Sequence, residues 1–341
     1  MLVVRSDAHR LHHGAELDRG EVIDSWEHPG RAEIVDAALA ELGWPSVEPA
    51  ALDRALVERV HDPTYVGFLE SAFTEWRAAG HTTDAAMAFA WPSRGGGRRP
   101  DDIEGRLGWH SFAADCSITA GTWAAAASGA AMAHTAADLV ADGAAAAFAR
   151  CRPPGHHATR DQFGGYCYLN NAAIAAQRLR DHGCATVAIV DVDYHHGNGT
   201  QEIFYDRADI AVASIHADPS TSFPFFAGHA DETGTGAGAG ATHNAPLPRD
   251  SDADTWFAAL DDALSWVGQR GPAATVVSLG VDTFVGDPIS SFRLATTDFD
   301  RIGARLRDLA TPVVFVLEGG YATDALGENV SRVLTGYESA A

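Results

Sequence analysis

Two aspartates and a histidine stand at alternate positions, Asp191, Asp193 and His195, directly after an apolar run from Ala185 to Val190. An uninterrupted apolar run of this length is typical of a strand that is buried on both faces of a parallel sheet. If the chain stays extended, side chains two positions apart leave the same face, so the two carboxylates and the imidazole would converge. Left unpaired, such buried groups would cost several kcal/mol, and a bound metal ion would resolve that cost.

Polar side chains also follow three other apolar runs, at residues 144–150, 274–281 and 312–317. His156 and His157 follow the first of these runs, Asp282 follows the second, and Tyr321 follows the third. The carboxyl ends of parallel strands lie on one edge of a sheet, where open α/β proteins bind ligands. We therefore expect all of these groups to meet in one crevice.

Asp193, His195 and Asp282 offer a metal ion two carboxylates and one imidazole. This set leaves positions open on the metal, which indicates a catalytic site, because structural zinc sites are closed and rich in cysteine. It suits Zn²⁺, Fe²⁺ or Co²⁺. Taken alone, Asp282 would be interpreted as an acid that begins a loop. The adjacent His156 and His157 would supply acid and base groups beside a water molecule on the metal.

Asp191 and Asn198 are candidate partners for the second ring nitrogens of the two histidines. Asn198 precedes a glycine, so turn formation explains it equally well, and both interpretations can hold together. The phenol of Tyr321 could donate a hydrogen bond to a developing oxyanion or could pack on the helix behind it. Tyr166 and Phe223 could wall a channel for an alkyl chain or belong to the core, and spacing alone leaves this open.

The glycine-rich loop at 228–240 lacks the following helix and basic anchor of a phosphate-binding loop, so that interpretation is weak. The net charge of −22 argues against nucleic acid and anionic membranes as partners. The chain contains no lysine, which excludes a Schiff-base mechanism. The four cysteines form no CxxC pair, and neither a signal peptide nor a membrane span is expected. These features favour a soluble protein of the cytoplasm.

Apolar strands alternate with helical patterns along the chain, which predicts an α/β fold with an open, mostly parallel sheet and helices on both faces. Helices are expected at 31–42, 52–60, 65–73, 117–141, 170–182, 200–205, 254–267, 299–309 and 325–334, and additional strands at 1–4 and 210–215. No interior linker divides the chain, so one domain over 1–341 is expected. A weakly periodic excursion at about 80–115 interrupts it.

Four segments in this order, CRPPGHHA, DVDYHHGNGTQ, SLGVDTFVGDP and LEGGY, resemble the metal-dependent deacetylase branch of the arginase/deacetylase fold. Within that branch the chain is most similar to the bacterial acetylpolyamine amidohydrolases, and the resemblance extends over nearly the whole chain. It implies a zinc-dependent amidohydrolase that removes acetyl groups from acetylated polyamines, which are small cationic amines, with a homodimer formed through the excursion that narrows the channel.

The resemblance also implies a role for each matching residue. Asp193, His195 and Asp282 would hold Zn²⁺, His157 would act as the general base with His156 as its electrostatic or acid partner, and Tyr321 would polarise the acetyl carbonyl. A structural K⁺ would lie near Asp191, Ser214 and the carbonyl groups of Asp193, His195 and Ile215. The substrate chain would be bound by Gly165, Tyr166, Phe223, Glu104 and Asp115.

Two positions bear on the choice of substrate. Many histone deacetylases carry Asp where this chain has Asn198, whereas the polyamine enzymes share the Asn. Asp115 stands where the polyamine branch has Glu, and its shorter side chain extends less far toward a bound substrate. The alternatives are a deacetylase of acetyl-lysine in proteins or of another small amine, a binuclear manganese hydrolase of the arginase type, and a non-enzymatic metal-binding scaffold. The excursion discriminates against the first alternative if it closes the channel in a dimer, because bulky peptides would then be excluded. A binuclear site would need further carboxylates near His195, for which Asn198 is a poor substitute. A non-enzymatic scaffold would be expected to lack Tyr321 or one of the histidines, and all are present.

Overall fold

A computed structural model describes residues 1–93 and 96–339 of the chain. Its strands are β1 Leu2–Val4, β2 Ala15–Asp18, β3 Glu21–Asp24, β4 Ser46–Val47, β5 Ala146–Ala149, β6 Val187–Asp191, β7 Ile210–Ala217, β8 Thr242–Leu247, β9 Ala274–Leu279 and β10 Val313–Leu317. Eight of them form one sheet in the order β4-β1-β5-β10-β9-β6-β7-β8, and every neighbouring pair is parallel. The strands β2 and β3 form a separate antiparallel hairpin.

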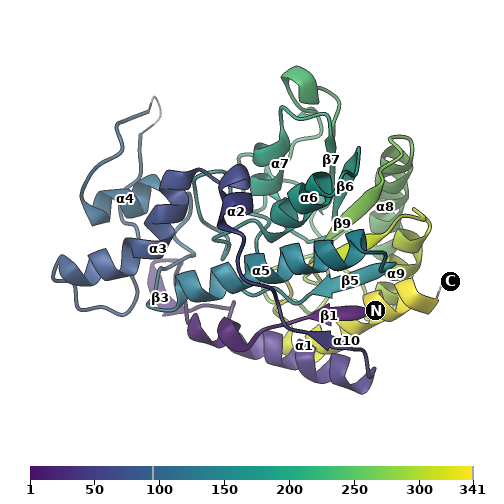
Figure 1. Ribbon diagram of the computed structural model, residues 1–341, viewed down its shortest axis with the longest axis horizontal. Helices are drawn as coiled ribbons and strands as arrows, with labels where there is room; N and C mark the ends of the chain where they lie inside the picture. Colours follow the sequence, from purple (N-terminus) through teal and green to yellow (C-terminus); the bar gives the residue numbers. More distant parts are fainter. Residues whose placement is uncertain (94–95, 340–341) are drawn as a thin grey trace.

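The helices of the described residues are α1 Pro29–Glu41, α2 Arg54–Val60, α3 Pro63–Ala78, α4 Ile103–Trp109, α5 Thr122–Ala141, α6 Asn171–Asp181, α7 Asn198–Phe204, α8 Ala253–Gly268, α9 Asp298–Arg307 and α10 Thr323–Ser339. The helices α1, α8, α9 and α10 pack on one face of the sheet, and α2, α3, α5 and α6 contribute to the core on the other (Figure 1). The predicted parallel sheet with helices on both faces is therefore confirmed.

Alternating side chains of each central strand enter the two cores. In β6, Val187 and Ile189 belong to the core that contains α5 and α6, whereas Ala188 and Val190 belong to the core that contains α8. Both faces of the strand are covered, and this explains why its sequence is apolar without alternation. The strand ends at Asp191, so the polar residues that follow lie at the edge of the sheet.

The fold contains elements that the sequence pattern did not predict. The strand β8 includes Pro246 and polar residues and lies at the edge of the sheet, where a missing N–H donor is tolerated. The strand β4 and the hairpin are short, with few apolar residues. The helix α4 lies within the predicted excursion and, in Figure 1, at the end of the molecule opposite the C-terminus.

The described residues 81–93 and 96–102 of the excursion are largely irregular, although Ala86 forms a bridge with Ile118. Arg94 and Gly95, which belong to this predicted segment, lie outside the described residues. The side chains of Phe89 and Trp91 are 71% and 41% exposed. No helix in the described part of the chain is long and apolar enough to cross a membrane.

Candidate active site

A pocket of about 770 Å³ opens beside the ends of β5, β6, β7 and β10. Most of the predicted site residues line it, although they come from distant parts of the sequence. Its lining includes Asp115, His156, His157, Gly165, Tyr166, His195, Phe223 and Tyr321. The parallel sheet thus brings these groups together at the edge where its strands end, as the positions of the apolar runs suggest.

The buried side chains of Asp193, His195 and Asp282 form a compact group at this pocket. One ligand atom from each lies within 4.8 Å of the other two. His195 Nδ1 is 3.3 Å from Asp193 Oδ1 and 3.0 Å from Asp282 Oδ2. Two carboxylates directed at one imidazole nitrogen, with almost no solvent, form a donor set that fits a divalent cation.

Backbone amides hold the carboxylates of this group in place. Asp193 Oδ2 accepts a hydrogen bond from Gly319 N at 2.9 Å, and Asp282 Oδ1 accepts one from Tyr194 N at 2.8 Å. Each aspartate therefore has one oxygen on the backbone and another directed toward His195. Burial, followed by the nearby charge of Asp193, raises the pKa of Asp282 to about 7.

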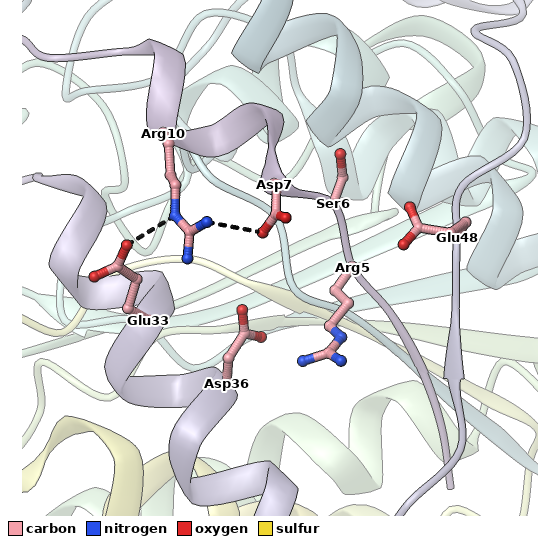
Figure 2. Close-up of a pocket in the computed structure, with 7 residues that line it drawn as sticks. All are labelled: Arg5, Ser6, Asp7, Arg10, Glu33, Asp36 and Glu48. Carbon is pink, nitrogen blue, oxygen red and sulfur yellow. Dashed lines mark hydrogen bonds and ion pairs between the residues drawn. The ribbon is translucent and has the colours of Figure 1, made fainter.

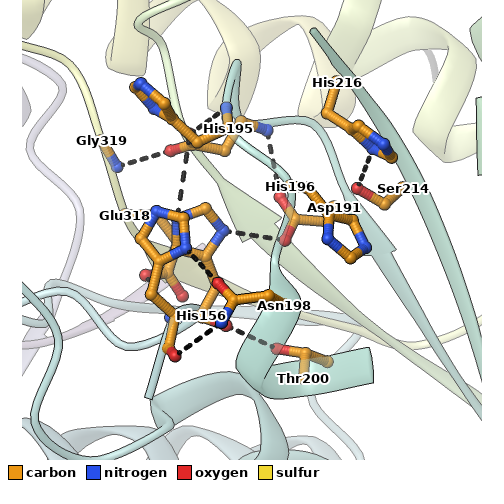
Figure 3. A network of polar contacts seen from close by, with 12 residues as sticks. His156, Asp191, His195, His196, Asn198, Thr200, Ser214, His216, Glu318 and Gly319 are labelled. Carbon is orange, nitrogen blue, oxygen red and sulfur yellow. Dashed lines mark hydrogen bonds and ion pairs between the residues drawn. The ribbon is translucent and has the colours of Figure 1, made fainter. Parts of the chain in front are cut away.

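The two adjacent histidines have different partners. His156 Nδ1 lies 2.9 Å from Asp191 Oδ2, and His157 Nδ1 lies 2.7 Å from Asn198 Oδ1, as Figure 3 shows for the labelled His156 and Asp191. Asp191 is therefore not part of the group around His195, because the strand ends there and the chain bends at residues 193–195. The condition for a shared face, a chain that stays extended from Asp191 to His195, is therefore not met, and Asp191 lies beside His156 instead.

The different partners give the two rings opposite protonation preferences. Burial alone would lower the pKa of His156, but the charges of Asp191 and Asp193 outweigh it and raise the pKa to about 10. Burial, together with the nearby His156 and His195, lowers the pKa of His157 well below its ordinary value. One imidazole therefore favours the charged form and its neighbour favours the neutral form.

Tyr321 lies on the turn that follows β10, and the side chain of Arg31 holds that turn. Arg31 Nε donates to Gly320 O and Arg31 Nη2 donates to Glu318 O, both at 2.7 Å. The Arg31 guanidinium also lies 4.6 Å from the centroid of the Tyr321 ring. Burial raises the pKa of Tyr321 well above its ordinary value, so its hydroxyl remains a hydrogen-bond donor.

Aromatic rings stand on the walls of the pocket beside these groups. The ring centroid of Tyr166 lies 5.6 Å from that of Tyr321, and the centroid of Phe223 lies 5.0 Å from that of His157. Gly165 has a φ of +57°, and a Cβ there would lie 2.2 Å from His157 Cδ2. Glycine at this position lets the loop approach the ring of His157 closely.

The two acids that the resemblance assigns to substrate binding occupy different places. Asp115 lines the pocket, and both of its oxygens accept from Gly165 N, at 2.9 and 3.1 Å. Glu104 lies on α4, 3.3 Å from His81, and is not among the residues that line the pocket. A single chain therefore does not bring Glu104 to this site.

Ser214 and Ile215 lie on β7, next to β6, and Ser214 is in register with Asp191. The hydroxyl of Ser214 lies 2.8 Å from His216 Nδ1 (Figure 3). The predicted potassium ligands Asp191, Ser214 and Ile215 thus come from two adjacent strands.

Sequence reasoning missed two buried acids near the site. Glu16, on β2, lines the pocket with 4% exposure, and its Oε2 has no hydrogen-bond partner. Glu318 Oε2 accepts from Gly155 N at 2.6 Å and from His156 N at 3.1 Å. Burial raises the pKa of Glu318 to about 8. The acid within LEGGY was a visible signal for Glu318, whereas nothing in the polar segment around Glu16 distinguished it.

A separate surface pocket of about 390 Å³ contains none of the predicted site residues (Figure 2). It is lined by two arginines, four acids and a serine, and Arg10 pairs there with Glu33 at 2.8 Å and with Asp7 at 3.4 Å. Its charges are thus partly paired with one another, and we assign it no role.

Comparison with known proteins identifies relatives along the whole chain. The model of the histone deacetylase domain family matches residues 25–337. Acetylpolyamine amidohydrolase 1 of Pseudomonas aeruginosa is 49% identical over 346 residues, with 100% of both chains covered. Acetylpolyamine amidohydrolase of Mycoplana ramosa is 48% identical over 339 residues, with 98% of this chain and 99% of the relative covered.

A solved structure agrees with these sequence matches. The crystal structure of acetylpolyamine aminohydrolase from Burkholderia pseudomallei superposes with a TM-score of 0.96 at 40% identity, and the match covers 100% of this chain and 99% of that one. The matched family consists of metal-dependent enzymes, in agreement with the compact group of two carboxylates and an imidazole. The chain therefore belongs to the histone deacetylase domain family and is a deacetylase that hydrolyses amide bonds.

Proposed function

We propose that this enzyme removes acetyl groups from acetylated polyamines and releases acetate and the free amine. The observation that carries the proposal is the convergence of His156, His157 and Tyr321 on the pocket that His195 of the candidate metal group also lines. Full-length relatives named acetylpolyamine amidohydrolase support the choice of substrate.

Asp193, His195 and Asp282 would hold the metal ion, and zinc suits these donors, as do Fe²⁺ and Co²⁺. When bound, such an ion polarises a carbonyl group and lowers the pKa of water from 15.7 to about 7. The backbone bonds to Asp193 and Asp282 would keep the carboxylates in place whether or not the substrate is present.

The residues around this group would carry out the proton transfers. His157 uses Nδ1 for Asn198, so its Nε2 is the nitrogen that can take a proton from the attacking water and return it to the leaving amine. The pairing of His156 with Asp191 favours an imidazolium, whose positive charge would stabilise the oxyanion. The Tyr321 hydroxyl would donate a hydrogen bond to the same oxygen as its negative charge develops.

The pocket walls suit a slender cationic chain. Tyr166 and Phe223 would flank its methylene groups, Gly165 would lie beside it, and the carboxylates of Glu16 and Asp115 would attract its ammonium group. Asp115 is already engaged by Gly165 N, so its attraction would act over a distance rather than through a freely extended side chain. Glu104 could contribute only if a second chain brought it to the pocket.

We also propose a homodimer in which the excursion forms the contact and narrows the channel. The exposed aromatic side chains of Phe89 and Trp91 on this segment support such a contact. We further propose that a structural K⁺ is bound near Asp191, Ser214 and the carbonyl groups of Asp193, His195 and Ile215. The proposed location of the enzyme is the cytoplasm.

A substrate panel tests the proposed activity against its alternative. The purified enzyme is assayed at equal concentrations of N-acetylputrescine, N-acetylcadaverine, N8-acetylspermidine and acetyl-lysine peptides, and metal content is determined on the same sample. We expect turnover of the acetylated polyamines, loss of turnover on chelation and recovery with added zinc. A preference for the peptides would favour the deacetylation of protein lysines, and turnover that survives chelation would contradict the metal-dependent mechanism.

A further inference from the structure

We infer that Asp287 is a positioning residue, whose carboxylate fixes the turn that presents Tyr321 to the reacting carbonyl. The inference rests on the proposed function, because it concerns how the phenol is held for that reaction. Asp287 does not line the pocket and acts through the backbone of the turn.

The contacts of Asp287 leave neither of its oxygens free. Oδ2 accepts from Tyr321 N at 2.7 Å and from Ala322 N at 3.2 Å, while Oδ1 accepts from Ile289 N at 3.1 Å. The residue is only 7% exposed. A buried carboxylate that satisfies three backbone donors is a strong and directional constraint, because charge-assisted hydrogen bonds are stronger than neutral ones.

The two donors on the turn need a partner from elsewhere in the chain. Tyr321 and Ala322 directly precede α10, which begins at Thr323, so helical hydrogen bonding does not satisfy their N–H groups. Asp287 comes from another loop and supplies an acceptor for both of these N–H groups from outside the helix. Its negative charge at the start of α10 is also favourable for the helix dipole.

The opposite side of the same turn is held through its carbonyl oxygens. Arg31 donates to Gly320 O and to Glu318 O, whereas Asp287 accepts from the next two amides. Gly320 has a φ of +129°, a conformation that L side chains rarely adopt. The turn is therefore held at its carbonyl oxygens by Arg31 and at its amide N–H groups by Asp287. Removal of the Asp287 carboxylate would release the amides of Tyr321 and Ala322.

The position of Asp287 also links the phenol to the candidate metal group. Asp282 lies five positions earlier on the same loop, and Val281 N donates to Gly319 O at 3.0 Å. One short loop therefore carries a candidate metal ligand and the acceptor for Tyr321 N. This arrangement would fix the position of the phenol relative to the residues that would hold a polarising ion.

The experiment compares Asp287→Asn with Asp53→Asn in the metal-loaded enzyme. Asp53 makes a similar contact with Leu56 N at 3.0 Å and does not line the pocket. An Asn has one acceptor oxygen, so it cannot serve both Ile289 and the turn. We expect kcat for N-acetylputrescine to fall about 10- to 100-fold with KM and metal content little changed, and Asp53→Asn to have no effect on either constant.

A double variant separates positioning from general damage. In a Tyr321→Phe background, Asp287→Asn should reduce kcat by less than about twofold, because residues that act as a unit are not additive. An equal fall in both backgrounds, or a rise in KM with kcat unchanged, would overturn the inference. If Asp287→Asn does not fold, Asp287→Ser, which retains one acceptor, takes its place with the same criteria.

Hydrogen exchange provides a measurement that does not depend on turnover. We expect the amides of Tyr321 and Ala322 to exchange at least about tenfold faster in Asp287→Asn than in the unaltered enzyme. If the unaltered enzyme hydrolyses none of the amides in the panel, the proposed function fails, and exchange still decides the role of Asp287. Unchanged exchange at both amides would overturn the inference even in an active enzyme.

Discussion

Tyr321 offers the pocket a phenolic hydroxyl that burial keeps protonated by raising its pKa. Its neighbours Arg31 and Asp287 hold the backbone on either side, so removal of the hydroxyl alone should leave the turn in place. We expect Tyr321→Phe to lower kcat about 10²- to 10³-fold, the usual cost of losing one oxyanion donor. Steady-state kinetics with metal analysis checks this result, and Tyr205→Phe serves as a remote control. Retention of more than half of kcat by Tyr321→Phe would rule out a catalytic phenol.

At the same scale, the histidine pair shows how the partner of a ring determines its chemistry. His156 and His157 are consecutive and equally buried, yet one faces a carboxylate and the other an amide. The sequence motif offered Asp191 and Asn198 as candidate partners, and the structure places each beside a different ring. The consequence is one group that favours a positive charge and one that can accept a proton, which is the combination that acid–base catalysis requires.

At the scale of elements, the ends of β6 and β9 approach so closely that a side chain cannot fit between them. A Cβ on Gly280 would lie 2.0 Å from Asp193 Oδ2, whereas a Cβ on Gly67, within α3, would meet nothing within 4 Å. We expect Gly280→Ala to weaken metal binding at least about tenfold, because the carboxylate must move. Metal content after dialysis checks this result, and retention of metal as in the unaltered enzyme would contradict it. Gly67→Ala should retain the metal and gain about 0.5–1 kcal/mol of stability.

His61 connects the segment between α2 and α3 to the start of α6. Its Nδ1 lies 2.8 Å from Thr159 O, and its Nε2 accepts from Asn170 N at 2.9 Å, so the neutral ring is the form that fits. Burial lowers its pKa to about 4, from 6.5 in the unfolded chain. The unfolded state therefore binds more protons between these values, and the contribution of His61 to stability is complete above pH 6.5 and is lost as the pH falls toward 4.

We expect the stability difference between the unaltered enzyme and His61→Gln to shrink by about 2 kcal/mol between pH 7 and pH 5. Urea unfolding at the two pH values measures this difference. His13→Gln, at an exposed position, serves as the matched control variant. A difference for His61→Gln that stays constant with pH would show that the ring can be protonated in the folded protein.

At the scale of the whole molecule, a net charge of −22 creates a field that attracts cations. We expect kcat/KM for N-acetylputrescine to fall about three- to tenfold as salt rises from roughly 0.02 to 0.5 M, because counterions screen this field. N-acetylbutylamine has the same chain length without the ammonium group and should show little dependence on salt. An equal response of the two substrates would exclude electrostatic attraction of the substrate.

The sequence by itself determined the fold class and eight of the residues that line the pocket, among them both histidines of the adjacent pair and Tyr321. The apolar runs at 185–190, 274–281 and 312–317 can be buried only in a covered parallel sheet, and the polar residues that follow them must then lie at one edge. The elements it failed to predict, β4, β8, α4 and the hairpin, are short or located at edges, where few apolar contacts leave a periodic signal.

The motifs suggested that Asp191 pairs with His156 and Asn198 with His157, and the structure contains both contacts. The tertiary structure decided the remaining contacts, because hydrogen bonds between distant loops leave no local pattern. It separated Asp191 from Asp193 and His195, placed Glu104 away from the pocket, and brought Glu16 into the pocket wall. It also directed the carboxylate of Asp287 at the turn before α10. Spacing along a strand fixes only the face on which a side chain leaves the backbone, whereas a contact depends on where every other strand end and loop comes to lie.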